Sequence, residues 1–171
     1  MEDSLYINNA GLVILAPYLP RYFKMLGMLE NDIFPDPETA ARAVLLLQYL
    51  ATGKTEAPEH ELVLNKILCN LHFTTPVPES IVLTEQEQEI SEQLLNAVLQ
   101  NWDKMSNSTV ENLRESFLLR AGMVREHEDH FSLMVENKGF DILLSFLPWT
   151  ISVVSLPWMD GRVEIEWRMG G

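Results

Sequence analysis

The sequence predicts an α+β fold, in which a helical amino-terminal two-thirds packs on a small, mostly antiparallel carboxyl-terminal sheet. Residues 8–122 hold several segments with apolar side chains at helical spacing. Over residues 123–168 the apolar side chains instead recur at every second position, as in half-buried strands. Helices followed by strands, without alternation along the chain, are typical of α+β proteins. We expect residues 1–171 to form one domain.

The stretch Phe140–Met159 is the apolar segment on which we expect the rest of the chain to pack. It carries one charge, Asp141, and the tripeptide Leu-Pro-Trp occurs in it twice, ending at Trp149 and at Trp158. About 20 apolar residues suffice to cross a bilayer, so a membrane-spanning helix is the alternative. Because proline breaks a helix interior, Pro148 instead predicts two buried pieces.

The two pieces have different patterns. Phe140–Phe146 predicts a short helix, with its leucines near one face. Thr150–Leu156 is rich in β-branched residues, which favour strands. Since strands that are buried on both faces are nearly continuously apolar, we expect Thr150–Leu156 to be the central strand of the sheet.

Two further segments alternate apolar and polar side chains, as strands with one buried face do. Residues 131–135 show this pattern, and residues 163–167 repeat it after the turn residues Asp160-Gly161. Val124–His127 is the expected hairpin partner of the first segment, with a turn at Glu128-Asp129. The sheet would then have about three or four strands.

Prolines, glycines and capping residues mark the ends of the expected helices. Pro17 separates two short helices, the second of which ends at Gly27. Asp36 caps a third helix, which ends before Gly53 and whose apolar centre indicates that it is the most buried helix. A fourth helix carries an apolar stripe over residues 64–71.

Two capping boxes are expected further along the chain. In such a box a Ser or Thr and a Glu three residues later satisfy each other's free backbone donors. Thr84 and Glu87 form the first, ahead of a helix with a stripe from Ile90 to Trp102. Ser108 and Glu111 repeat the pattern, and we expect the helix that follows them to end at Gly122.

The charge balance limits the partners that the chain can bind. Of 171 residues, 12 are lysine or arginine and 25 are aspartate or glutamate, so the net charge is -13. Because binding to a phosphate backbone rests on lysine and arginine, this balance excludes nucleic acid as a partner and disfavours an anionic membrane.

Cysteine usage and the first residues bear on the compartment. The single cysteine, Cys69, excludes an internal disulfide framework. Residues 1–4 are acidic, and no basic segment followed by an apolar one indicates a secretory signal. We therefore expect synthesis in the cytoplasm. Only a few residues precede the first patterned segment, as in a domain excised from a longer protein.

The sequence offers one dense group of potential metal ligands. His127 and His130 are flanked by Glu126, Glu128 and Asp129. A small metal-dependent enzyme that uses the two histidines is therefore the alternative function. Zinc sites usually need three or four converging ligands, and the polarity of a solvated turn explains the group equally well.

No other pattern points to catalysis. The sequence has no glycine-rich phosphate-binding loop and no glycine-flanked serine. Cys69 and His72 lie one helical turn apart but supply only two ligands, and a buried thiol is the simpler interpretation. We expect no catalytic residue, no metal, no cofactor and no enzyme activity.

Six blocks of the sequence, in order, resemble the carboxyl-terminal part of the tape measure proteins of contractile injection systems, which are phage-tail-like particles. The resemblance covers nearly all of the 171 residues. The blocks are Ile7–Leu12 with Leu15–Pro20, Leu46–Leu50, Glu59–Leu62 with Leu64–Lys66, Leu113–Leu118, Phe140–Leu144, and Leu147–Trp149 with Leu156–Met159.

The resemblance implies a structural role in particle assembly. Members of the family are longer, so this chain is similar to their terminal domain. A whole protein of this kind would help to set tube length, beside the tube, sheath and baseplate proteins that are its expected partners. The resemblance also implies that the domain becomes part of the particle after assembly in the cytoplasm, and it offers no catalytic residue.

Four residues of these blocks are the ones that we expect to contact a partner. Asn8 and Asn9 precede the first helix, and Trp149 and Trp158 stand beside prolines at the ends of segments. Tryptophan is enriched among the residues that dominate binding energies. The alternatives are core packing for the tryptophans and helix capping for the asparagines.

Overall fold

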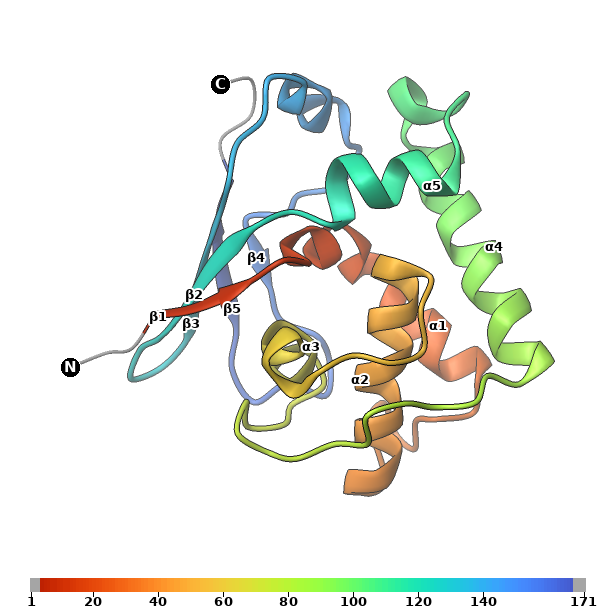
Figure 1. Cartoon of the computed structure of the whole chain (residues 1–171), viewed down its shortest axis with the longest axis vertical. Coiled ribbons are helices and arrows are strands. Elements are labelled where there is room, and N and C mark those ends of the chain that lie inside the picture. The colour runs from red at the N-terminus through yellow and green to blue at the C-terminus, as the bar shows by residue number, and fades with distance from the viewer. Residues whose placement is uncertain (1–3, 168–171) are drawn as a thin grey trace.

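The computed structural model describes residues 4–167. A five-stranded sheet stands on one side, and the long helices lie against one of its faces (Figure 1). The 3-10 helix η1 (Ala10–Tyr18) and α3 (Val63–Leu68) lie nearest the sheet, followed by α2 (Pro37–Thr52), and α4 (Glu85–Asn101) lies furthest from it (Figure 1). The predicted α+β class is confirmed.

The remaining helices are short. They are α1 (Leu19–Met25), α5 (Val110–Leu113), the 3-10 helices η2 (Glu59–Glu61), η3 (Asp103–Met105) and η5 (Asp141–Phe146), and the π-helix η4 (Arg114–Leu118).

The sheet is mixed, with the strand order β1-β2-β3-β5-β4. Strands β3 and β5 are parallel, while the other three neighbouring pairs are antiparallel, as the prediction of a mostly antiparallel sheet requires. The strands are β1 (Ser4–Ile7), β2 (Gly122–Glu126), β3 (Phe131–Val135), β4 (Val153–Val154) and β5 (Val163–Glu166).

The sheet is not confined to the carboxyl-terminal part of the chain, because β1 precedes every helix. It pairs with β2 so that Ile7 lies opposite Gly122. In this strand Ser4 and Leu5 are partly buried, Tyr6 is exposed and Ile7 is buried. Four residues without a clear alternation of apolar and polar side chains do not stand out in the sequence, so the prediction missed the strand.

The expectation that Thr150–Leu156 forms the central strand was wrong. Only Val153 and Val154 of this segment are in a strand, and that strand, β4, is at an edge of the sheet. The prediction took the continuous apolar run of Thr150–Leu156 as a sign of burial on both faces of the sheet. The helices cover one face, so this sign was misleading. Val153 is 49% exposed, while Ile151 and Leu156 turn into the core.

Most of the predicted helix ends are confirmed. Asp36 Oδ1 accepts a hydrogen bond from the Thr39 amide at 2.8 Å, and Gly53 closes α2 with a φ of 78°. In the first capping box, Thr84 Oγ1 accepts from the Glu87 amide and Glu87 Oε1 accepts from the Thr84 amide, both at 3.0 Å. These caps satisfy backbone donors that no helical carbonyl can reach.

The prediction that Pro17 separates two short helices was wrong. Pro17 lies inside η1, and α1 follows η1 directly at Leu19.

Three further helix predictions need correction. The cap of α5 is Thr109 and not Ser108, since Thr109 Oγ1 accepts from the Asn112 amide. Gly122 begins β2 instead of ending a helix. All six residues of α3 are buried, against ten of the 16 in α2, so α3 is the more buried helix.

Candidate partner-binding surface

Asn9 lies in a buried cluster of three side-chain amides. Its Nδ2 donates to Gln48 Oε1 at 2.9 Å and to Asn65 Oδ1 at 2.7 Å. Asn9 is 2% exposed, and although it stands at the start of η1 it makes no side-chain capping hydrogen bond. The cluster joins the start of η1 to α2 and α3, and the neighbouring Asn8 is exposed to solvent.

Trp158 packs in the core and is 4% exposed. Its ring lies against those of Phe23 and Phe34, with centroids 5.6 and 5.1 Å away. Its Nε1 donates to the carbonyl oxygen of Leu68 at 2.6 Å. The free surface of the monomer therefore contains little of Trp158.

Trp149 is half-buried and contacts the amino-terminal helices. Its Nε1 donates to the carbonyl oxygen of Ile14 at 3.0 Å. Its ring meets that of Tyr18 edge to face, with centroids 5.3 Å apart. Of the four predicted contact residues, Asn8 and Trp149 thus present surface to solvent, while Asn9 and Trp158 lie inside.

His127 and His130 flank the turn between β2 and β3, as the hairpin prediction requires. Their rings stack with centroids 4.5 Å apart, and His127 Nε2 hydrogen-bonds with Ser132 Oγ. The hydrogen bond from His130 holds the pKa of Asp129 below its usual value. Within residues 4–167 no three His, Cys, Asp or Glu side chains converge to hold a metal ion. The structure therefore gives the metal-dependent alternative no support.

The segment Leu113–Leu118 holds the end of α2. Arg114 Nε donates to the carbonyl oxygen of Leu50 at 3.1 Å, and its Nη2 donates to that of Tyr49 at 3.2 Å. Helix carbonyls in the last turn have no partner within the helix, so Arg114 caps α2 from outside. Gly53 leaves room for it, because a Cβ there would lie 2.9 Å from Arg114 Nη1.

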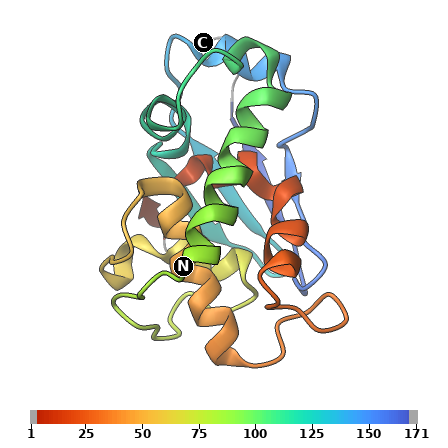
Figure 2. The same cartoon turned by 90° about the vertical axis from the view of Figure 1, so that its right-hand side faces the viewer.

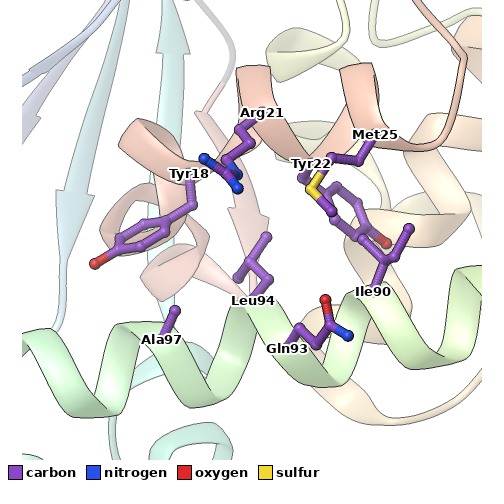
Figure 3. A pocket seen from close by; sticks show the side chains of 8 residues that line it. All are labelled: Tyr18, Arg21, Tyr22, Met25, Ile90, Gln93, Leu94 and Ala97. Carbon is purple, nitrogen blue, oxygen red and sulfur yellow. The ribbon is translucent and has the colours of Figure 1, made fainter.

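An apolar groove of about 350 Å³ runs between α1 and α4 (Figure 3). The two helices lie side by side on the surface (Figure 2). Tyr18, which ends η1 directly before α1, and three residues of α1 form one wall, and four residues of α4 form the other. In both walls the residues are spaced i, i+3, i+4 and i+7, the spacing of one helix face. These residues are Tyr18, Arg21, Tyr22 and Met25 on one wall and Ile90, Gln93, Leu94 and Ala97 on the other (Figure 3).

Two hydrogen bonds fix the walls of the groove. Tyr22 and Ser91 share a buried hydrogen bond of 2.7 Å, and Asn101 Nδ2 donates to the Tyr18 hydroxyl at 2.9 Å. Burial raises the pKa of Tyr22, which therefore stays neutral. Since Tyr18, the last residue of η1, pairs with the later residue of α4 and Tyr22 of α1 pairs with the earlier one, the walls run antiparallel.

The groove has mostly apolar walls, and exposed charges of opposite sign lie on the two helices that form them. Met25 is 43% exposed and Ile90 is partly exposed. Arg21 lines the groove and is exposed, and Lys24, which is also exposed, follows it by three residues on α1. On α4 the exposed Glu89 and Glu85 precede the lining Gln93 by four and eight residues, so helical geometry places them along the same edge of the helix. The sequence did not reveal this groove, because the same helices carry stronger apolar stripes that face the core.

No helix within residues 4–167 has both the length and the apolar character needed to span a bilayer. The stretch Phe140–Met159 folds as the six-residue helix η5 and the edge strand β4, so the membrane-spanning alternative for this stretch was wrong. Leu144, Ile151 and Trp158 of this stretch lie in the core.

The fold and its surface define an α+β domain that presents a helix-lined apolar groove. The chain belongs to the family of contractile injection system tape measure proteins, whose family model matches residues 1–167. No curated protein and no solved structure matches the chain. The resemblance seen in the sequence blocks is confirmed. The family is a structural one within an injection particle, and membership implies interaction with other particle components.

Proposed function

We propose that this chain is the carboxyl-terminal domain through which a tape measure protein is anchored to tube or baseplate components, so that tube length is set during assembly. Assembly takes place in the cytoplasm in this proposal, and the domain then stays in the particle. Asn8 and Trp149 contact the partner directly, while Asn9 and Trp158 hold the segments that carry them.

The dimensions of the domain carry the proposal. A molecular ruler needs an extended segment as long as the tube that it measures. The longest helix within residues 4–167 is α4, with 17 residues, which corresponds to about 25 Å. The other described elements pack around a shared core. A folded body of this kind suits attachment, which supports a role as an anchor.

The charge of the domain supports a protein partner. At a net charge of -13 the chain repels phosphate-rich surfaces and attracts basic ones. We therefore expect the partner, a tube or baseplate protein, to present a basic patch to this domain.

Deletion of the segment encoding residues 4–167 from the complete particle gene cluster tests the proposal. Electron microscopy is expected to show few assembled particles, or tubes of variable length. A wild-type copy supplied in trans is the control and is expected to restore uniform particles. Particles of normal number and uniform length in the deletion strain would overturn the proposal.

A further inference from the structure

We propose that the groove between α1 and α4 is the docking site for one amphipathic helix of another injection-particle protein. The inference rests on the proposed function and deepens it by naming the surface and the chemistry of the partner. It rests on the shape of the groove, on the helical walls that offer no strand edge for pairing, and on the exposed charges along its two sides.

The shape of the groove matches a helix. Its walls are two antiparallel helices, and each presents residues i to i+7, a stretch of about 10 Å or two helical turns. A third helix laid between them can place its side chains between those of the walls, as packed helices do. Methionine, which adapts to different partners, stands at the rim as Met25.

The walls also exclude an extended occupant. All eight residues that line the groove come from helical segments, so no strand edge borders it. An extended segment would leave its backbone N–H and C=O groups unpaired against apolar side chains, which is costly. A helix satisfies these groups internally.

A second copy of the chain fits less well than a helix from another protein. Two copies related by a two-fold axis would bring hollow against hollow, which leaves the grooves unfilled. Each copy also carries a net charge of -13, so two copies repel each other.

The exposed charges along the two sides of the groove define the flanks of the partner helix. Within residues 4–167, none of Arg21, Lys24, Glu85 and Glu89 has an ion-pair partner. A docked helix with lysine or arginine on the flank facing α4 and aspartate or glutamate on the flank facing α1 would complement both sides. Opposite charges across an interface favour one orientation of the partner. Trp149, which packs on Tyr18, extends the contact at one end of the groove.

Two substitutions on α4 form a matched test. Ala97→Arg places a long charged side chain in the groove, whereas Asn96→Arg adds the same charge at a neighbouring exposed position that does not line it. The full chain is co-expressed with the tube and baseplate proteins of its own particle, and the dissociation constant of the purified complex is measured. We expect Ala97→Arg to weaken the complex about tenfold or more and Asn96→Arg to change it less than about twofold.

A photo-crosslinking amino acid at position 93 provides a second measurement that does not depend on the folding of Ala97→Arg. Gln93 is exposed, so the replacement leaves the core intact. The expected crosslink joins position 93 to a helical segment of a tube or baseplate protein with apolar residues at i, i+3 or i+4, and i+7. A crosslink to a second copy of the chain, a crosslink to an extended segment, or no crosslink would overturn the proposal.

The outcomes separate the groove from the wider function. If the wild-type chain binds a particle protein and Ala97→Arg binds it equally well, the groove proposal fails while the anchoring proposal stands. If the wild-type chain binds no particle protein, both proposals fail.

Discussion

Arg120 and Asp141 form a two-point ion pair in the interior of the protein. Arg120 Nη1 donates to Asp141 Oδ2 at 2.7 Å and Nη2 donates to Oδ1 at 2.9 Å, and neither side chain is exposed. Trp167 Nε1 also donates to Asp141 Oδ2, at 3.0 Å. The pair therefore ties the segment after η4 to the start of η5 and to the residue that follows β5.

Removal of one partner of this pair is expected to be strongly destabilising. Arg120→Met leaves the Asp141 carboxylate buried without its counter-charge, which lowers the free energy of unfolding by about 3 to 5 kcal/mol. Urea denaturation at neutral pH measures this loss. The control is Arg162→Met, whose pair with Glu164 is half-exposed and contributes about 1 kcal/mol or less. Equal losses for the two variants would show that the buried pair has no special role.

The same pair predicts acid lability. Burial by itself raises the pKa of Asp141, but the hydrogen bonds from Arg120, Trp167 and the Lys138 amide outweigh it and hold the pKa below its usual value of 3.8. The unfolded chain therefore takes up this proton more readily than the folded one. The resulting stability is present above about pH 4 and is lost as the pH falls through the lowered pKa.

Urea midpoints measured from neutral pH down to about pH 3 test this dependence. Glu59 beside Lys66 and Glu87 beside Arg42 also have lowered pKa values, because their hydrogen bonds outweigh the opposing effect of burial. Both the wild type and Asp141→Asn should therefore lose stability in acid. The variant is expected to lose less, and two parallel curves would refute the contribution of Asp141.

The sequence predicted the features that depend on neighbouring residues. Asp36, Gly53 and the Thr84–Glu87 box act within one or two turns of their own helix, so their spacing was informative. The edge position of β4 depends on how distant segments pack, and so does the pairing of Arg120 with Asp141 across 21 positions. No local pattern carries that information.

The candidate site was likewise predictable only in part, because some of its features depend on distant segments. The sequence singled out Trp149, and the structure places it beside the α1–α4 groove through Tyr18. The sequence did not distinguish the partly exposed Trp149 from the buried Trp158, since both follow a proline in the same tripeptide. Which indole faces the core is decided by Phe23 and Phe34, which come from distant segments.

Gly11 marks a close approach between the backbones of η1 and η4. A Cβ at this position would lie 1.8 Å from the carbonyl oxygen of Phe117, so the two backbones would have to move apart. We expect Gly11→Ala to lower the free energy of unfolding by about 3 kcal/mol or more, measured by urea denaturation. Gly139→Ala is the control, since a Cβ there meets nothing within 4 Å, and its effect should stay within about 0.5 kcal/mol. An unchanged free energy of unfolding in Gly11→Ala would contradict the packing described for η1.

Cys69 is expected to be unreactive in the folded protein. The thiol is buried, and burial raises its pKa, so both access and the reactive thiolate are limited. A thiol reagent such as Ellman's reagent should label native protein slowly and unfolded protein completely, with the labelling rate rising as urea unfolds the chain. Rapid and complete labelling without urea would mean that the core around Cys69 opens readily.

The most direct test of the central claim is the affinity of the chain for the tube and baseplate proteins of its own particle. Each protein is titrated into the folded chain in a calorimeter, at low salt and at high salt. The account predicts a saturable complex with at least one of them, which weakens as salt screens the acidic surface. Absence of binding to every tube and baseplate protein, up to about 100 μM, would contradict the assignment of this domain as an anchor.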